Sequence, residues 1–236
     1  MTTDLQAVIE AGTLDSKSAQ EIVAWAVKEF GSGLGLASSF GAEDVILIDM
    51  LVKADPKARI FTLDTGRLNQ ETYDVMDKIK EKYNCAIETY FPEASRVEGM
   101  VREKGFNLFY ESIDNRKLCC NIRKVEPLNR ALKGLKAWMT GLRREQVVTR
   151  AAVKKVEGDE GHHMYKINPL ADWTWEEVWT YIRANKVPYN ALHDQGYPSI
   201  GCEPCTRAVK PGEDFRAGRW WWERPEEKEC GLHVKH

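Results

Sequence analysis

The chain has 236 residues, enough for one sizeable buried core, so we expect a single domain over residues 1–236, with its core at about 16–210 and a C-terminal segment and mobile tail at about 211–236. The composition is that of an ordinary globular protein, and 34 basic against 36 acidic side chains, a net charge of -2, exclude a general nucleic-acid-binding protein. The N-terminus lacks a signal-peptide pattern and no apolar run is long enough to span a bilayer, so we expect a cytoplasmic protein without a membrane partner.

The N-terminal half alternates between helix and strand signals. Ser18 and Glu21 form a capping box ahead of apolar residues at helical spacing, which predicts a helix that ends at Gly31. Short apolar or β-prone runs predict strands at 34–40, 59–63, 86–91 and 137–141, with helices at 43–54 and 68–83. This alternation is typical of an α/β fold in which helices flank a parallel sheet of about four or five strands.

The C-terminal half carries one further helix signal, a capping box at Thr174 and Glu177 followed by apolar residues at helical spacing. Residues 154–163, which are charged and rich in glycine, predict a mobile surface loop. Beyond the capping-box helix, glycine and proline become frequent and the periodicity fades, so we expect the last fifty residues or so to form loops.

Two predicted strand ends carry residues suited to an anionic ligand. Ser38, Ser39 and Gly41 lie where the first strand gives way to a helix, and their hydroxyl and backbone N–H groups can face an anion. Residues 63–67 follow the second strand, where parallel sheets place ligand-binding loops. Ordinary turns explain either segment equally well, and the first lacks the G-K-[ST] ending of a nucleoside-triphosphate P-loop.

The chain has six cysteines, which we expect to be thiols, metal ligands or catalysts because the cytosol keeps structural disulfides reduced. Cys119 and Cys120 are adjacent, and Cys202 and Cys205 form a C-x-x-C pair. Four thiolates can hold a tetrahedral zinc ion or an iron-sulfur cluster, and an adjacent pair, whose backbone we expect to be contorted, favours the cluster. Zinc and four unligated thiols remain alternatives, and Cys85 is expected to fill a gap in the core.

Cys230 stands apart from these pairs, in a charged tail near the end of the chain. A nucleophilic cysteine needs thiolate character, which nearby cations supply, and the upstream arginines or His233 are the candidates. The flanking glutamates oppose the thiolate, so the cations must come from the folded site. An incidental cysteine on a frayed tail is the alternative.

Three basic groups complete the candidate residues: Arg123 with Lys124, Arg143 with Arg144, and Arg216 with Arg219. We expect Lys124 and Arg216 to be surface cations whose loss weakens turnover more than stability. Together the three groups can supply forked donors to phosphate and sulfate oxygens. The tryptophans at 220–222 suit a core or an interface.

These motifs, in this order, resemble the assimilatory adenylylsulfate and phosphoadenylylsulfate reductase family, specifically its bacterial iron-sulfur branch, over most of the chain. The stretches that carry the resemblance are residues 38–44, 63–66, 119–120 with 123–124, 141–144, 202–205, 216 with 219, and 229–233. The resemblance implies a Rossmann-like, adenine nucleotide α-hydrolase-like sheet. It also implies one four-iron four-sulfur cluster per chain, on Cys119, Cys120, Cys202 and Cys205. The branch that prefers the 3′-phosphorylated nucleotide lacks both cysteine pairs, so the implied substrate is adenylylsulfate.

The activity that the resemblance implies is thioredoxin-dependent reduction of adenylylsulfate to sulfite and AMP, in sulfate assimilation and cysteine biosynthesis. Cys230 would attack the sulfate sulfur and carry an S-sulfonate, from which thioredoxin or glutaredoxin releases sulfite. A homo-oligomer is compatible with this assignment. The residues implied in substrate binding are Ser38, Ser39, Phe40, Gly41, Leu63, Asp64, Thr65, Gly66, Lys124, Arg143, Arg216, Arg219 and His233.

Three other functions are weighed against this one. The nearest is a reductase for the 3′-phosphorylated nucleotide, or one with dual specificity. An ATP-dependent PP-loop tRNA thiolase would share the fold, but its usual S-G-G-x-D-S loop differs from residues 39–44 here. A zinc-stabilised interaction domain is the non-enzymatic alternative, and it would be colourless and free of iron and sulfide.

Overall fold

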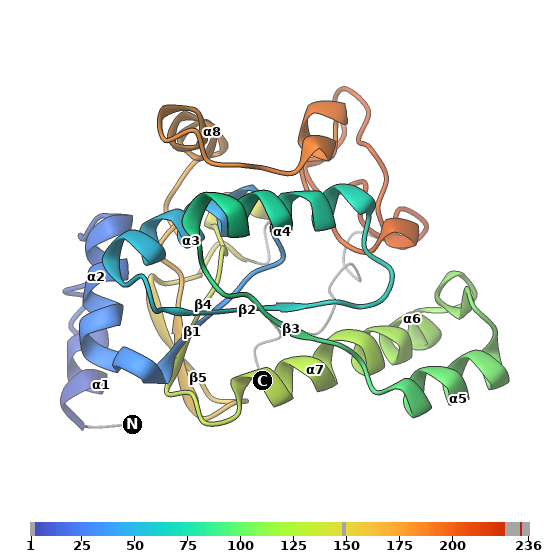
Figure 1. Cartoon of the computed structure of the whole chain (residues 1–236), viewed down its shortest axis with the longest axis horizontal. Helices are drawn as coiled ribbons and strands as arrows, with labels where there is room; N and C mark the ends of the chain where they lie inside the picture. The colour runs from blue at the N-terminus through green and yellow to red at the C-terminus, as the bar shows by residue number, and fades with distance from the viewer. Residues whose placement is uncertain (1–2, 148–149, 225–231, 233–236) are drawn as a thin grey trace.

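The computed structural model describes residues 3–147, 150–224 and 232. Within them one sheet of six strands has the order β3-β2-β1-β4-β6-β5 (Figure 1). Neighbouring strands are parallel except for β5, which runs antiparallel to β6. The strands are β1 (Leu34–Ala37), β2 (Arg59–Leu63), β3 (Glu88–Tyr90), β4 (Ala137–Met139), β5 (Val156–Asp159) and β6 (Met164–Ile167). The predicted α/β fold with a mostly parallel sheet is thus confirmed.

The strand order reverses beside β1, and this reversal decides where a ligand can bind. From β1 the chain continues outward through β2 and β3, and it then returns to place β4 on the opposite side of β1. In open parallel sheets such a reversal opens a crevice at the carboxyl ends of the strands. The turns after β1, β2 and β4 therefore meet at one edge of the sheet.

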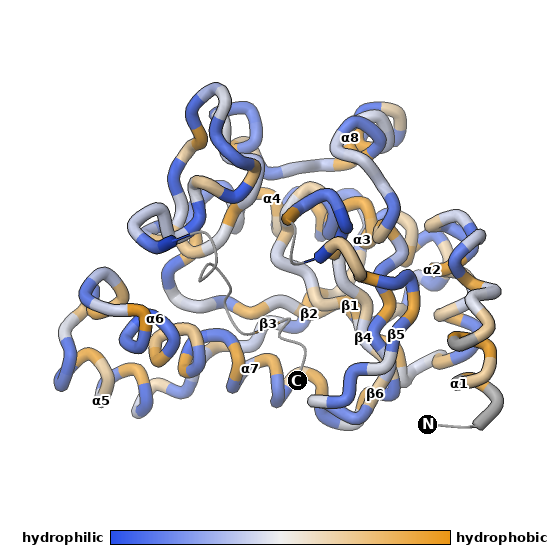
Figure 2. Tube along the Cα trace, turned by 180° about the vertical axis from the view of Figure 1, so that it is seen from behind, coloured by the Kyte–Doolittle hydropathy of each residue, from blue (hydrophilic) through white to orange (hydrophobic). Residues whose placement is uncertain are grey.

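Helices cover both faces of the sheet (Figure 1). Helices α2, α3 and α4 lie on one face, with α8 packed against α3, and α7 lies on the other face against β2 and β3. Figure 2 shows hydrophobic residues concentrated along α3 and mainly hydrophilic residues along the C-terminal loops. The helices are α1 (Thr3–Glu10), α2 (Ala19–Phe30), α3 (Ala42–Ala54), α4 (Gln70–Tyr83), α5 (Ala94–Lys104), α6 (Ile113–Cys120), α7 (Glu126–Leu132) and α8 (Trp175–Ala184).

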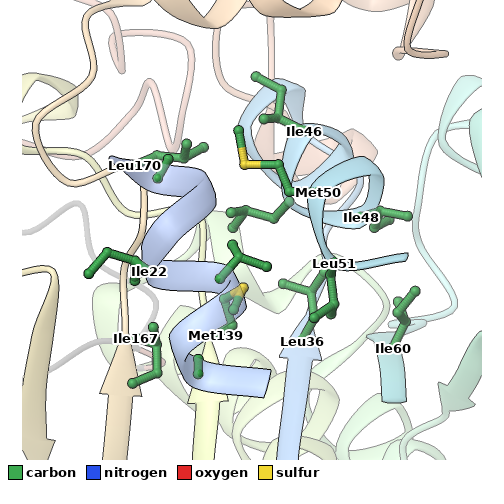
Figure 3. Close-up of a cluster of buried hydrophobic side chains, with 14 of the residues drawn as sticks. Ile22, Leu36, Ile46, Ile48, Met50, Leu51, Ile60, Met139, Ile167 and Leu170 are labelled. Carbon is green, nitrogen blue, oxygen red and sulfur yellow. The ribbon is translucent and has the colours of Figure 1, made fainter. Parts of the chain in front are cut away.

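The main core lies between the sheet and helices α2 and α3 (Figure 3). Ile22 of α2, Met50 of α3 and Leu36 of β1 all belong to this core, and all three side chains are buried. Residues 42–51 of α3 are buried all round, because the sheet, α2, α4 and α8 enclose this helix. Cys85 belongs to the same core, as predicted.

Both predicted capping boxes are confirmed, at Ser18 before α2 and at Thr174 before α8. The four predicted strands are all present: β2 has the predicted bounds, and β1, β3 and β4 are shorter than predicted. The expectation of four or five strands was wrong, as was that of a loop at 154–163, because β5 and β6 add a hairpin. Strand β5 reads Val-Glu-Gly-Asp and pairs on one side only, so it shows neither an apolar run nor a clear alternation.

After α8, the described part of the chain up to residue 224 contains only short 3-10 turns, Ala191–Gln195 and Glu203–Cys205, and one isolated bridge. The expectation of loops there is confirmed. No helix among the described residues is long and apolar enough to cross a membrane.

Candidate active site

A cavity of about 210 Å³ opens where the turns after β1, β2 and β4 meet. Ser38, Ser39 and Gly41 from the first turn and Leu63 and Thr65 from the second line it. The cations on its wall come from elsewhere in the chain: Lys124, Arg150, Arg216 and Arg219. The structure therefore brings together most of the residues predicted to bind the substrate.

The turn between β1 and α3 is held by its own side chains. The backbone N–H and the hydroxyl of Ser39 donate to Oδ2 of Asp44, at 2.6 Å and 2.7 Å, and the N–H of Phe40 donates to the Ser38 hydroxyl. Phe40 has a φ of 59° and is fully buried, so its ring belongs to the core and is not part of the cavity wall. The backbone strain at Phe40 fixes the path by which the turn enters α3.

The buried Asp44 gives this turn a pH dependence. Burial raises the pKa of Asp44 to about 6, although the hydrogen bonds from Ser39 lower it. Because the pKa of Asp44 in the folded protein lies above its ordinary value of 3.8, the carboxylate lowers stability as pH rises from about 4 to about 6. Asp44→Asn should stabilise the protein by up to roughly 3 kcal/mol at pH 7.5 and by less than about 1 kcal/mol at pH 4.

Thermal unfolding of both proteins across this pH range tests the prediction. The exposed Asp77 of α4 provides the control, since Asp77→Asn should leave the melting temperature unchanged at every pH. A melting difference between wild type and Asp44→Asn that stays constant from pH 4 to pH 7.5 would contradict it.

The turn after β2 connects the cavity to the cysteines. Oδ1 of Asp64 accepts from the N–H of Gly66 at 2.8 Å, so Asp64 shapes the turn, and neither residue is on the cavity wall. The hydroxyl of Thr65 lies 3.2 Å from Sγ of Cys202. The backbone carbonyl of Thr65 accepts a hydrogen bond from Nη1 of Arg123 at 2.6 Å. Contact of Asp64 and Gly66 with the substrate stays a prediction.

Cys119, Cys120, Cys202 and Cys205 are all buried and line a second cavity of about 20 Å³. The first two close helix α6, and a π-helical turn, Asn121–Val125, follows them. The backbone at Cys120 is regular helix, φ -63° and ψ -39°, so the expected contortion between the adjacent cysteines was wrong. The irregularity lies one residue later, where the wider turn redirects the side chains that follow.

The charges around the thiols differ from one cysteine to the next. Burial acts to raise the pKa of Cys202, but Lys124, the Thr65 hydrogen bond, Arg219 and Arg123 outweigh it and bring this pKa below its usual value. Burial and the nearby Cys202 raise the pKa of Cys205 to about 12. In the described residues no group of three or more histidine, cysteine or acidic side chains is arranged to hold a metal ion.

Lys124 lines both the cavity at the strand ends, here called the larger cavity, and the smaller cavity at the four cysteines, called the cysteine cavity. Arg216 and Arg219 reach the larger cavity from the C-terminal segment and are 7% and 8% exposed. The expectation that Arg216 is a surface cation was therefore wrong, since the segment around it folds back over the strand ends. Its removal should affect stability as well as turnover.

Gly201 leaves room for the guanidinium of Arg219. A Cβ at this position would overlap the guanidinium nitrogens and lie 2.6 Å from Cζ, and only the flexible end of the arginine would have to move. Gly201→Ala should therefore displace this cation at little cost in stability. We expect kcat/KM for an anionic substrate to fall by about 10 to 100-fold, the effect of losing one charge-assisted contact.

Gly99→Ala in α5 is the matched control, because a Cβ there meets no atom within 4 Å. Steady-state kinetics and thermal unfolding of both variants separate the two effects. A Gly201→Ala enzyme with unchanged kcat/KM would show that Arg219 does not contact the substrate.

Arg143 is not part of the cavity wall. It is 1% exposed, and its Nε donates to Glu43 at 2.8 Å while its Nη1 donates to Glu145 at 2.9 Å. Substrate binding by Arg143 stays a prediction.

Sequence reasoning missed Arg150 and His193, which do line the cavity, because no motif surrounds either residue.

Cys230 and His233 lie outside the described residues. Leu232, which stands between them and is described, lines the larger cavity and packs against the cluster of Phe61, Leu128 and Trp138.

An α/β sheet with its cavity at the switch point, ringed by cations and bordered by buried thiols, defines a nucleotide- or anion-binding enzyme of the parallel-sheet class. The sequence profile of the phosphoadenosine phosphosulfate reductase domain matches residues 33–208. The chain belongs to this family.

Relatives of known name lie close in sequence. The chain is 50% identical over 234 residues to an adenosine 5′-phosphosulfate reductase of Burkholderia cepacia, covering 99% of this chain and 90% of the relative. It is also similar to a crystal structure of phosphoadenylyl-sulfate reductase from Candida auris, with a TM-score of 0.75, 32% identity and coverage of 89% of this chain and 98% of the other.

A more distant likeness, to the FMN adenylyltransferase of Candida glabrata, concerns the fold alone. It has a TM-score of 0.55 and 13% identity, and it covers 83% of this chain and 67% of the other.

Proposed function

We propose that this protein reduces adenylylsulfate to sulfite and AMP in sulfate assimilation, in the cytoplasm, with a dithiol protein such as thioredoxin as the reductant. The observation that carries the proposal is the place of Lys124 on the wall shared by the larger cavity and the four buried thiols. A family membership and a Burkholderia cepacia relative named adenosine 5′-phosphosulfate reductase support the substrate.

The cavity suits an adenine nucleotide that ends in a sulfate. The turns that carry Ser38, Ser39, Leu63 and Thr65 supply hydroxyl and backbone groups for the nucleoside. Lys124, Arg216 and Arg219 supply the positive charge that phosphate and sulfate oxygens require. The chain as a whole is slightly acidic, so this local charge is what attracts the anion.

In the proposed reaction the thiolate of Cys230 attacks the sulfate sulfur. A bond forms between Sγ and that sulfur, the bond from sulfur to the bridging oxygen breaks, and AMP leaves with the electron pair on its phosphate. Lys124, Arg216 and Arg219 stabilise the charge that grows on this oxygen. One thiol of the reductant then attacks Sγ of Cys230 and forms a mixed disulfide, while sulfite departs with the electron pair. The second thiol closes a disulfide on the reductant, and Cys230 leaves as the thiolate.

Leu232 supports this role for the tail. Two residues of chain span at most about 7 Å, so a cysteine two positions from Leu232 is within reach of the cavity that Leu232 lines. The neighbouring arginines are the cations that a nucleophilic cysteine needs.

The four buried cysteines fit an iron-sulfur cluster by the chemistry of their side chains, because soft sulfur is the ligand that such a cluster takes and all four line one cavity. We propose that Cys119, Cys120, Cys202 and Cys205 hold one four-iron four-sulfur cluster. When bound, it would supply a polarisable charge next to Lys124. Visible absorbance with iron and sulfide assays tests this, and a colourless protein that contains zinc would count against it.

A steady-state comparison of two nucleotides tests the function. With thioredoxin as reductant, adenylylsulfate should give sulfite and AMP with a much higher kcat/KM than the 3′-phosphorylated nucleotide. Equal values would indicate dual specificity, and a preference for the 3′-phosphorylated nucleotide would reassign the substrate. Absence of sulfite from both would refute the proposal.

A further inference from the structure

The segment at 219–223 contacts both cysteine pairs. Arg219 forms an isolated antiparallel bridge with Thr206, and the N–H of Trp220 donates to the carbonyl of Cys205 at 3.1 Å. The indole of Trp220 is buried in the same cluster as the four thiols. This segment leads, seven residues later in the sequence, to Cys230.

An ion pair with helix α6 is the second contact that holds the segment at 219–223. Nε and Nη2 of Arg116 donate to the two carboxylate oxygens of Glu223, at 3.0 Å and 2.8 Å. The two side chains are 1% and 3% exposed, and the guanidinium lies 4.9 Å from the centre of the Trp220 ring. A forked pair of this kind fixes both position and orientation.

Arg116 also belongs to the surroundings of the thiols, since it lines the cysteine cavity. It precedes Cys119 and Cys120 by three and four residues on α6, so the three side chains lie on one face of the helix. Burial acts to lower the pKa of Arg116, but Glu223 and, more weakly, Cys120 raise it. Whatever fixes the two thiols therefore also fixes the guanidinium that holds Glu223.

We propose that the pair of Arg116 and Glu223 couples the four-cysteine site to the chain segment that carries Cys230, with Glu223 as a positioning residue for the nucleophile. The inference rests on the proposed function. A purely structural pair would add stability without affecting delivery of the nucleophile. The coupling instead makes the order of the C-terminal segment and the retention of the cluster depend on each other, because such coupling is reciprocal.

Glu223→Gln tests the coupling, since it keeps the size of the side chain and removes its charge. Three measurements on the purified enzyme are needed: iron and sulfide per chain, hydrogen exchange of peptides from 221–236, and kcat and KM per iron-loaded chain. We expect kcat per loaded chain to fall about tenfold with KM within about twofold, and exchange of 221–236 to quicken about tenfold. A chelator should also bleach the visible absorbance of the variant faster.

The pair of Arg59 and Glu88, which is far more exposed than that of Arg116 and Glu223, provides the control, and Glu88→Gln should change none of these values. If Glu223→Gln does not fold, Arg116→Lys, which keeps the charge and loses the fork, should show the same changes to a smaller extent. Activity that falls only in proportion to lost iron, or unchanged exchange of 221–236, would overturn the coupling. Hydrogen exchange needs no substrate, so it separates this failure from that of the proposed function, which is a wild-type enzyme inactive on adenylylsulfate.

Discussion

Cys230→Ser is expected to abolish sulfite release while the enzyme still binds adenylylsulfate and keeps its iron. The hydroxyl of serine is a far weaker nucleophile than a thiolate, so kcat should fall by at least about 10⁴-fold. After mixing with adenylylsulfate, intact-protein mass spectrometry should find a sulfonate adduct on the wild type and none on the variant. Nucleotide binding is then measured by calorimetry on the same preparation.

The control for this experiment is Cys85→Ser, which alters a thiol of the core. It should lower the melting temperature and leave adduct formation intact. A sulfonate that persists on the Cys230→Ser enzyme would refute the assignment of the nucleophile.

Lys124→Met is expected to have the second-largest effect, because this lysine borders both the larger cavity and the cysteine cavity. Methionine keeps most of the apolar stem and removes the charge. Loss of one preorganised group that stabilises a developing negative charge costs about 10² to 10³-fold in kcat. Single-turnover formation of the sulfonate adduct isolates this effect from the later release of sulfite.

Lys117→Met in α6 is the matched control, since Lys117 is exposed and lines neither the larger cavity nor the cysteine cavity. It should react at the wild-type rate. If Lys124→Met lowered the melting temperature and iron content in step with kcat, Lys124 would be a structural residue.

The elements that sequence reasoning predicted correctly carry strong local signals. Capping boxes at Ser18 and Thr174 satisfy backbone donors within four residues, so the helix starts do not depend on the rest of the fold. Strands β1 and β4 are buried along nearly their whole length and read as apolar runs. Because parallel strands end at one edge, the turns at Ser38 and Leu63 had to meet.

The features that were missed depend on contacts between distant residues. Arg143 has the same sequence signal as a ligand-binding arginine, but Glu43, one hundred residues away, pairs with it in the interior. Arg216 looked exposed because it lies in a glycine-rich loop, and only the fold-back of that loop buries it. The ion pair of Arg116 and Glu223 likewise cannot be predicted from the sequence, because only the folded contact between α6 and residues 219–223 brings the two side chains together.

The π-helical turn at Asn121–Val125 joins α6 to α7 in one continuous rod. An α-helix advances about 100° per residue, so the register of this turn sets the angle between the thiols of Cys119 and Cys120 and the ammonium group of Lys124. Deleting one residue between Cys120 and Lys124 would rotate Lys124 about the helix axis and move its ammonium group away from the two cavities that it now lines. An insertion or deletion within 119–124 should therefore disturb the active site even where it leaves the helix intact.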